Sequence, residues 1–224
     1  MKTFIVIAAY NEGESIIKVI SDLRKHGHNN IVVVDDGSKD NTYDVIKKQD
    51  VYALKHVINR GQGAALRTGI DFAIKEGADI IVTFDADGQH LAEDIKSVIK
   101  PVESKEVDVV LGSRFLDKRT KVPFMKKMTL KAGILFTLIF SGIKLTDTHN
   151  GFRAFSRKAA QEIKIMQDRM EHASEIIDEI ARKKISFKEV PVKIVYSEYA
   201  KAKGQSIFNS IRIAFKFLFG KLVR

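Results

Sequence analysis

Two aspartates separated by one residue, Asp85 and Asp87, are the sharpest chemical signal in this sequence. They follow an apolar run at residues 80–84 that has the length of a buried strand, so both carboxylates would leave the same turn. Such a pair suits a hard cation such as Mg²⁺, which takes one or two carboxylates together with phosphate oxygens and water. A solvated turn or a helix cap is the competing interpretation, because Asp is favoured there too. The buried run before the pair, and Gln89 and His90 after it, favour the metal.

Other polar clusters occupy the same kind of position, directly after a predicted strand. They are Asn11-Glu12, Asp35-Asp36 and Ser113-Arg114. Open α/β sheets bind ligands outside the carboxyl ends of their strands, so four clusters at equivalent ends predict one site. A fifth segment, Asn59-Arg60-Gly61-Gln62-Gly63, places a cation and two glycines before a helix, where a diphosphate or sugar could approach the backbone. A flexible helix entry explains that segment equally well.

The elements that must position these residues alternate between short apolar runs and helical periodicity. We expect strands at 4–8, 31–34, 51–57, 80–84 and 107–111, and helices at 15–23 and 63–75. This alternation predicts an α/β fold with a doubly wound, mainly parallel sheet flanked by helices. The second half is less regular: a loop at 147–153, a helix at 169–183, an extended segment at 185–195, and an apolar-faced tail from Ile207.

The charge of the chain is divided unevenly. The 224 residues carry a net charge of +10, with 15 Lys and Arg against 18 Asp and Glu in residues 1–114, and 23 against 10 in residues 115–224. A basic half suits an anionic partner: nucleic acid, a membrane surface or a phosphorylated ligand. The absence of cysteine excludes disulfides and thiolate–metal sites. No apolar run is long enough to span a bilayer and no signal peptide is evident, so we expect an intracellular protein of one domain.

Several common motifs are excluded. An EF-hand loop needs glycine at its sixth position, but the run from Asp85 has it at the fourth. The segment from Gly61 lacks the third glycine of a dinucleotide fingerprint, and no P-loop sequence occurs. No two histidines have zinc-ligand spacing.

The clusters above, together with Gly151-Phe152-Arg153, occur in the order seen in family 2 glycosyltransferases. The chain resembles the branch that contains dolichyl-phosphate mannosyltransferase and other polyprenyl-phosphate sugar transferases, over about residues 3–206. The resemblance implies a GT-A fold with a mixed, mainly parallel sheet, a nucleoside-diphosphate sugar donor (UDP or GDP) and Mg²⁺ or Mn²⁺. It also implies a nucleotide- and metal-binding half at 1–114 and an acceptor- and membrane-facing half at 115–224.

The resemblance also implies roles for residues at matching positions. The nucleotide site would comprise Ala8, Tyr10, Glu12, Asp36, Arg60 and Asp85. The metal and diphosphate would be held by Asp85, Asp87 and Gln89. An acceptor phosphate would meet Arg114, Arg153, Lys201, Lys203 and Ser206, the last three in a closing segment. The catalytic set would include Asp87, Arg114, Arg153 and Glu175. Asp147, in a loop where the family usually has small residues, completes the set as an alternative base.

The implied reaction is an inverting displacement at the anomeric carbon of a hexose. A polyprenyl phosphate is largely ionised at neutral pH because its second pKa is about 6, so a dedicated general base would be dispensable. An alcohol acceptor, the alternative, would need a carboxylate base at Asp147 or Glu175. The resemblance does not distinguish UDP from GDP, or one hexose from another.

Residues 118–146 and 199–224 share one character. Each segment is basic, free of acids and rich in Leu, Ile and Phe, as expected of helices in an anionic membrane interface. Ordinary packing helices with solvated lysines would have the same pattern. With a lipid acceptor, we expect peripheral contact with the cytoplasmic face of the membrane through both segments.

Two other classes of function remain as alternatives. A nucleic-acid-binding protein would explain the charge, but acidic strand ends repel phosphates unless a metal intervenes. A sugar-phosphate nucleotidyltransferase usually has a glycine-rich basic loop after its first strand, and residues 8–12 contain neither glycine nor a basic residue.

Overall fold

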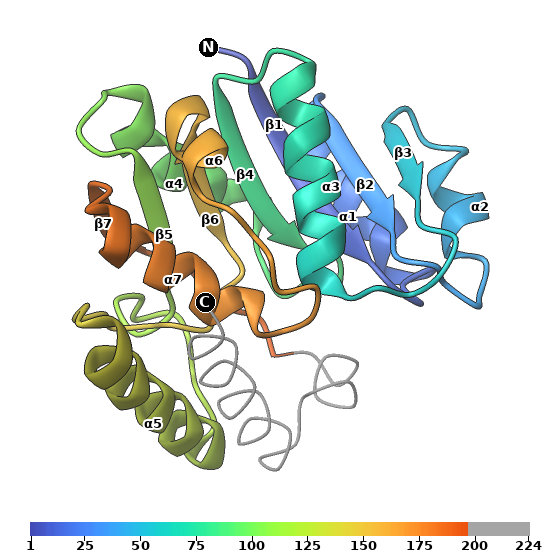
Figure 1. Ribbon diagram of the computed structural model, residues 1–224. Coiled ribbons are helices and arrows are strands. Elements are labelled where there is room, and N and C mark those ends of the chain that lie inside the picture. Colours follow the sequence, from blue (N-terminus) through green and yellow to red (C-terminus); the bar gives the residue numbers. More distant parts are fainter. Residues whose placement is uncertain (197–224) are drawn as a thin grey trace.

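A computed structural model of the chain describes residues 1–196. Its centre is one seven-stranded sheet with the strand order β3-β2-β1-β4-β6-β5-β7 (Figure 1). The strands are β1 (Thr3–Ala9), β2 (Ile31–Asp35), β3 (Tyr52–Lys55), β4 (Ile80–Asp85), β5 (Val109–Ser113), β6 (Arg153–Ser156) and β7 (Phe187–Pro191). All neighbouring pairs are parallel except the two that include β6. The expected mixed, mainly parallel sheet is therefore confirmed.

Strand β6 runs against its neighbours, which places its first residue at the edge where the other strands end. Arg153 pairs in register with Thr83 of β4 and Leu111 of β5. The sequence predicts a loop that ends at Arg153, and this end is wrong by one residue because β6 begins there. A central strand needs partners on both sides, and the two flanking strands supply them from positions far along the chain.

Helices cover both faces of the sheet, as expected for a doubly wound fold (Figure 1). They are α1 (Ser15–Lys25), α2 (Thr42–Ile46), α3 (Gln62–Lys75), α4 (Ile95–Glu103), α5 (Phe124–Ser141), α6 (Arg157–Glu162) and α7 (His172–Lys183), with a 3₁₀ turn, η1 (Ala92–Asp94). Helices α1 and α4 bury their apolar stripes on one face, and α3, α6 and α7 bury theirs on the other. The alternating side chains of β1 contribute to both cores: Ile5 and Ile7 to one, Phe4 and Val6 to the other.

Helix α5 differs from the others because it lies beyond the carboxyl edge of the sheet (Figure 1). Only Leu130 and Thr137 are buried in its 18 residues. Its exposed large apolar side chains are Phe124, Met125, Met128, Leu135, Leu138, Ile139 and Phe140. None of the helices within residues 1–196 is both long and apolar enough to cross a membrane.

The predicted elements are present, with shifted ends. The third strand covers only Tyr52–Lys55 instead of 51–57, and the helix expected at 169–183 begins at His172. The extended segment expected at 185–195 forms β7, which ends at Pro191, opposite Ser113, where its partner strand β5 also ends. Residues 199–224, including the tail from Ile207, lie outside the described residues.

Candidate active site

The turn after β4 carries the paired carboxylates at the carboxyl edge of the sheet. Burial raises the pKa of Asp85 above its ordinary value, although the positive charges of Arg153 and Arg114 oppose this. Burial, and then the like charge of Asp85, raises the pKa of Asp87. The two carboxylates therefore repel each other in a partly desolvated turn. Gln89 donates to Asp87 through both its backbone N–H and its side-chain amide, so the predicted metal and diphosphate residues form one cluster.

Three neighbours fix the position of Asp85. The Gln62 amide donates to Oδ1 at 3.2 Å, and His90 Nδ1 accepts the backbone N–H of Asp85 at 3.2 Å. His90 is buried and stacks on Phe152, and burial lowers its pKa to about 4, so it is neutral near pH 7. Gly151 leaves room for this carboxylate, because a β-carbon there would lie 2.7 Å from Asp85 Oδ1 and displace it. Gln62 is a site residue that the sequence analysis did not single out.

The donor set of this turn fits a divalent cation. Two oxygen ligands with raised pKa values gain most from a positive charge, because a cation removes their mutual repulsion. Among the residues that the structure describes, no cluster of three or more His, Cys, Asp or Glu side chains is arranged to hold a metal alone. A hard cation held by Asp85 and Asp87 would therefore need ligands from a substrate or water.

A second cluster, at the end of β5, is built around the buried guanidinium of Arg114. Asp147 Oδ2 accepts the Arg114 Nε–H at 2.6 Å and its backbone N–H at 3.1 Å. The other guanidinium nitrogens donate to the Tyr196 hydroxyl and the His149 carbonyl. Burial lowers the pKa of Arg114, but Asp147 and Tyr196 together more than offset this, and the pKa is raised. The structure thus brings the predicted residues Arg114 and Asp147 together as an ion pair.

Arg153 enters the same region from the first position of β6. Its side chain is 3 % exposed and donates to the carbonyl oxygens of Asn150 and Ala173. Burial lowers its pKa to about 10, against the opposing effect of the Asp85 and Asp147 carboxylates. Arg153 is therefore a cation at neutral pH, close enough to Asp85 for their charges to interact.

The first turn of α5 adds a cation that the sequence analysis did not single out. Lys126 lies over the Tyr196 ring, with its Nζ 4.7 Å from the ring centroid. Burial and then the charge of Arg114 lower its pKa, while Asp87 and Asp147 raise it, so Lys126 lies among these site residues. In the sequence it is one of seven basic residues in 118–146, and only the fold distinguishes it from the rest.

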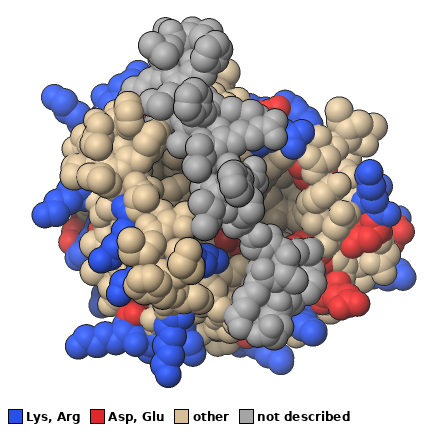
Figure 2. All heavy atoms as spheres, turned by 90° about the horizontal axis from the view of Figure 1, so that it is seen from below, with Lys and Arg blue, Asp and Glu red and all other residues tan. Residues whose placement is uncertain are grey.

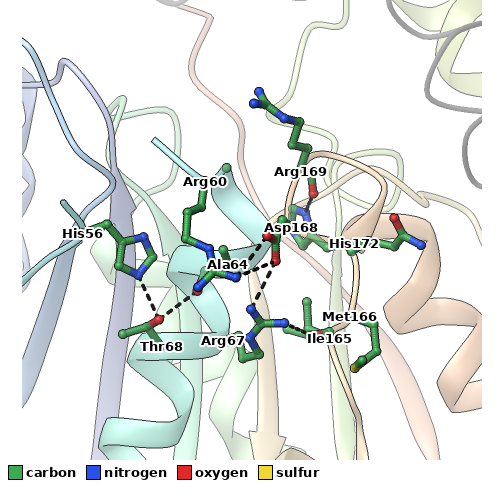
Figure 3. Close-up of polar contacts among 12 residues, drawn as sticks. His56, Arg60, Ala64, Arg67, Thr68, Ile165, Met166, Asp168, Arg169 and His172 are labelled. Carbon is green, nitrogen blue, oxygen red and sulfur yellow. Dashed lines mark hydrogen bonds and ion pairs between the residues drawn. The ribbon is translucent and has the colours of Figure 1, made fainter. Parts of the chain in front are cut away.

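The nucleotide side of the site is organised by Asp36, just after β2. Asp36 is 2 % exposed, and its carboxylate accepts the backbone N–H groups of Arg60 and Gly61 at 3.0 and 2.7 Å. His56 Nδ1 lies 2.8 Å from the same carboxylate, and His56 Nε2 contacts Thr68 on α3 (Figure 3). Asp36 therefore anchors the loop between β3 and α3, and a contact of its carboxylate with the nucleoside stays a prediction.

Arg60 extends from that loop toward a second loop, at residues 163–171. Its guanidinium pairs with Asp168 at 3.1 Å, and Arg67 of α3 pairs with the same carboxylate at 3.1 Å (Figure 3). The two loops touch closely, because a β-carbon at Gly61 or Gly63 would lie 2.4 or 2.1 Å from a carbonyl oxygen of Asp168 or Gln167. The glycines of this segment are thus required by loop packing.

Three further predicted nucleotide residues follow or end β1. Ala8 pairs in register with Asp85 on the neighbouring strand. Tyr10 is 38 % exposed, and Glu12 is buried with its backbone N–H donating to Thr42 Oγ1 at 2.8 Å. The charge of Glu12 contributes to the raised pKa of Asp85. The residues predicted from this segment therefore lie along the edge that carries the paired carboxylates.

Glu175 is placed differently from the other predicted catalytic residues. It is buried in the first turn of α7, and its Oε2 accepts the backbone N–H groups of Met166 and Gln167 at 2.9 and 2.8 Å. The carboxylate thus faces the loop before its own helix. Lys201, Lys203 and Ser206, the remaining predicted site residues, lie outside the described residues.

Figure 2 shows the molecule from the carboxyl edge of the sheet. Acidic side chains gather on the right of this face, and basic side chains surround much of the rest. The division agrees with the charge of the two halves of the sequence.

Comparison with known proteins extends these observations. Residues 4–164 match the family model described as glycosyl transferase family 2. An uncharacterized protein of Methanocaldococcus jannaschii is 40% identical over 98% of this chain and 92% of its own length. The UDP-N-acetylglucosamine–dolichyl-phosphate N-acetylglucosaminyltransferase of Methanococcus voltae is 35% identical over 98% and 96%. The undecaprenyl-phosphate mannosyltransferase of Micrococcus luteus is 29% identical over 95% and 93%.

Solved structures share the fold. Glucosyl-3-phosphoglycerate synthase from Mycobacterium tuberculosis, in complex with Mn²⁺ and UDP-glucose, superimposes with a TM-score of 0.74 over 97% of this chain and 76% of that one, at 14% identity. The same enzyme has been crystallised with Mg²⁺ and UDP, with a TM-score of 0.69, covering 97% of this chain and 76% of that one. This likeness confirms the expected GT-A-type architecture.

Proposed function

The chain belongs to glycosyl transferase family 2, and from this premise we propose that it transfers a hexose from a UDP- or GDP-sugar to a polyprenyl phosphate. The displacement inverts the configuration at the anomeric carbon and takes place at a membrane surface. Relatives at 35% and 29% identity whose names specify dolichyl and undecaprenyl phosphate support the acceptor class.

The observation that carries this proposal is the pairing of two clusters of opposite charge. Asp85 and Asp87 form one, and the cations Arg114, Arg153 and Lys126 form the other. Arg153 pairs in register with Thr83, two residues before Asp85, so the two clusters adjoin, and the charges of each act on the pKa values of the other. A site that takes two phosphorylated substrates needs both: acids that hold a cation for the donor diphosphate, and cations for the acceptor phosphate.

Asp85, Asp87 and Gln89 would hold Mg²⁺ or Mn²⁺. The ion would neutralise charge on the diphosphate that leaves. The chain's own cations would align the acceptor phosphate, and such fixed charges act without reorganisation during the reaction.

The alternative, an alcohol acceptor, needs a carboxylate that accepts a proton. Asp147 Oδ2 accepts two hydrogen bonds from Arg114, and Glu175 Oε2 accepts two from the backbone. These hydrogen bonds already engage the carboxylate oxygen that would have to accept the proton of the alcohol. A phosphate acceptor requires no such base, so the observed contacts favour it.

Substrate transfer tests the proposal directly. UDP- and GDP-activated glucose, mannose and N-acetylglucosamine would each be incubated with undecaprenyl and dolichyl phosphate, with Mn²⁺ or with EDTA. We expect one donor to give a lipid-linked sugar of inverted configuration, and no product with EDTA. Transfer to neutral sugars, with none to either lipid phosphate, would contradict the acceptor class.

Peripheral membrane contact through 118–146 and 199–224 is part of the same proposal. The exposed apolar side chains of α5 and the acid-free basic sequence around it support contact with an anionic surface of the cytoplasmic leaflet. The full chain should sediment with anionic liposomes at low salt. Replacing both Leu135 and Ile139 with Glu should weaken binding to the liposomes about tenfold. Replacing Ile17, an exposed residue of α1, with Glu should not weaken it. Wild-type protein left wholly in the supernatant would contradict this contact.

A further inference from the structure

Glu189, in the middle of the edge strand β7, holds the loop that follows α5. Its carboxylate accepts the backbone N–H of Thr146 at 2.9 Å through each oxygen, the Thr146 hydroxyl at 2.7 Å and the backbone N–H of Asp147 at 3.1 Å. Four contacts from two consecutive residues define the path of the loop there. A single side chain therefore supplies the hydrogen bonds that this non-regular backbone needs.

The residues held by Glu189 are those that hold Arg114. Asp147 accepts both the backbone N–H and the Nε–H of Arg114. Thr146 Oγ1 lies 2.6 Å from the hydroxyl oxygen of Ser113, the residue before Arg114. The contacts thus form a chain from Glu189, through Thr146 and Asp147, to the guanidinium.

The sheet fixes Glu189 itself. Strand β7 pairs with β5, and Glu189 lies in register with Leu111, three residues before Arg114. Rigid strands hold functional groups more precisely than loops do. The loop at Thr146–Asp147 is therefore connected to β5 in two ways. Thr146 contacts Ser113 directly, and Glu189 links the loop to β7, which pairs with β5.

We propose that Glu189 is a positioning residue for phosphate binding, which it serves by fixing Asp147 and through it the orientation of Arg114. The inference rests on the proposed function only in naming the acceptor phosphate as the group that Arg114 binds. Without the carboxylate, the loop would relax, and Asp147 would hold the guanidinium less often in the orientation that meets the acceptor. Donor binding at Asp85 and Asp87 would be little affected.

Steady-state kinetics with Glu189→Ala, which removes every acceptor atom, test this role. We expect the KM for undecaprenyl phosphate to rise about tenfold, with the donor KM changed less than about twofold, because about 1.4 kcal/mol corresponds to tenfold and is typical of one hydrogen bond. Glu106→Ala is the matched control, since Glu106 pairs with Lys188 of β7 and not with the loop. In an Arg114→Lys background, Glu189→Ala should add less than about twofold, because residues in one chain of contacts are not additive. Equal rises in both KM values, or full additivity, would overturn the proposal.

A second measurement does not depend on activity. In ¹⁵N spectra of arginine side chains, the Arg114 Nε–H, identified by its loss in Arg114→Lys, should exchange slowly with water because Asp147 accepts it in a buried site. Glu189→Ala should speed its exchange at least tenfold, while exchange of the Arg153 Nε–H changes little. Unchanged exchange of Arg114 would overturn the positioning role, whatever the substrates prove to be. If wild-type protein transfers no sugar to a lipid phosphate but the exchange changes as expected, only the proposed function fails.

Discussion

The turn after β4 and the loops that surround it use their carboxylates in opposite ways. In the turn, burial raises the pKa values of Asp85 and Asp87, and the two charges oppose each other. In the loops, the carboxylates accept N–H groups; these loop-anchoring acids are Asp36, Asp147, Glu175 and Glu189. The difference separates the acids that hold the loops in place from the two that would gain from a nearby positive charge.

The same contrast predicts that the two kinds of acid contribute differently to the stability of the fold and to activity. Removing a loop-anchoring acid leaves buried N–H groups without an acceptor, which costs about 1–3 kcal/mol. Removing an acid of the turn relieves repulsion and leaves the fold intact. The largest effect on activity should therefore come from an acid of the turn, and the largest effects on stability from the loop-anchoring acids.

Asp87→Asn should have the largest effect on activity. The carboxylate is the ligand that we expect a cation to need, so transfer should fall about a thousandfold or more, equivalent to roughly 4 kcal/mol. Transfer assays at saturating donor and Mn²⁺ would measure this, with Asp71→Asn on the exposed surface of α3 as the control. Activity within tenfold of wild type would remove Asp87 from the metal-binding role.

Asp147→Asn should have the next largest effect. The Asn side chain can keep one oxygen near Arg114 but cannot neutralise its charge, so we expect transfer to fall about a hundredfold. Asp94→Asn, which breaks a comparable contact with Arg119, should change transfer less than threefold. If Asp147→Asn also acquired a steep dependence on pH and was rescued by added base, Asp147 would be a general base rather than a holder of Arg114.

The stability of the protein in EDTA should distinguish the two classes of acid without any substrate. For Asp85 and Asp87 the pKa is raised from 3.8 on folding, so the folded state binds more protons and stability falls as the pH rises from about 4 toward the raised values. Asp87→Asn should reduce that fall and raise the melting temperature near pH 7 by a few degrees. Saturating Mn²⁺ should stabilise the wild type but not the variant. A lower melting temperature for Asp87→Asn in EDTA would refute the repulsion between the two acids.

Glu175→Gln should have the smallest effect. The amide oxygen of Gln can accept the same two backbone N–H groups, so we expect transfer within about threefold of wild type. Glu175→Ala leaves both N–H groups without this acceptor and should cost about 1–3 kcal/mol of unfolding free energy, measured by urea titration. A thousandfold loss of transfer in the folded Gln variant would instead assign Glu175 the role of base.

Much of the site could be predicted from local sequence. The buried strands and their polar ends have short-range patterns, and parallel strands that end at one edge bring Glu12, Asp36, Asp85 and Arg114 to that edge. The roles of Lys126 and Gln62 could not be predicted from the sequence, for a physical reason. Lys126 is one of seven basic residues in its segment, and Gln62 lies in the segment 59–63 beside the cation and glycines that the pattern singles out. The relation of the two residues to Asp87 and Asp85 arises only on folding.

By itself the sequence determined the α/β layout, the edge that holds the site and the metal-type pair Asp85 and Asp87, because these follow from periodicity and from neighbours one or two residues apart. Only the tertiary structure decided that β6 runs antiparallel and delivers Arg153 to that edge. It also decided which carboxylates anchor loops and which lie close enough for their charges to repel. The partners that settle this, such as Glu189 and Thr146, are 43 residues apart, and no local pattern encodes such a contact.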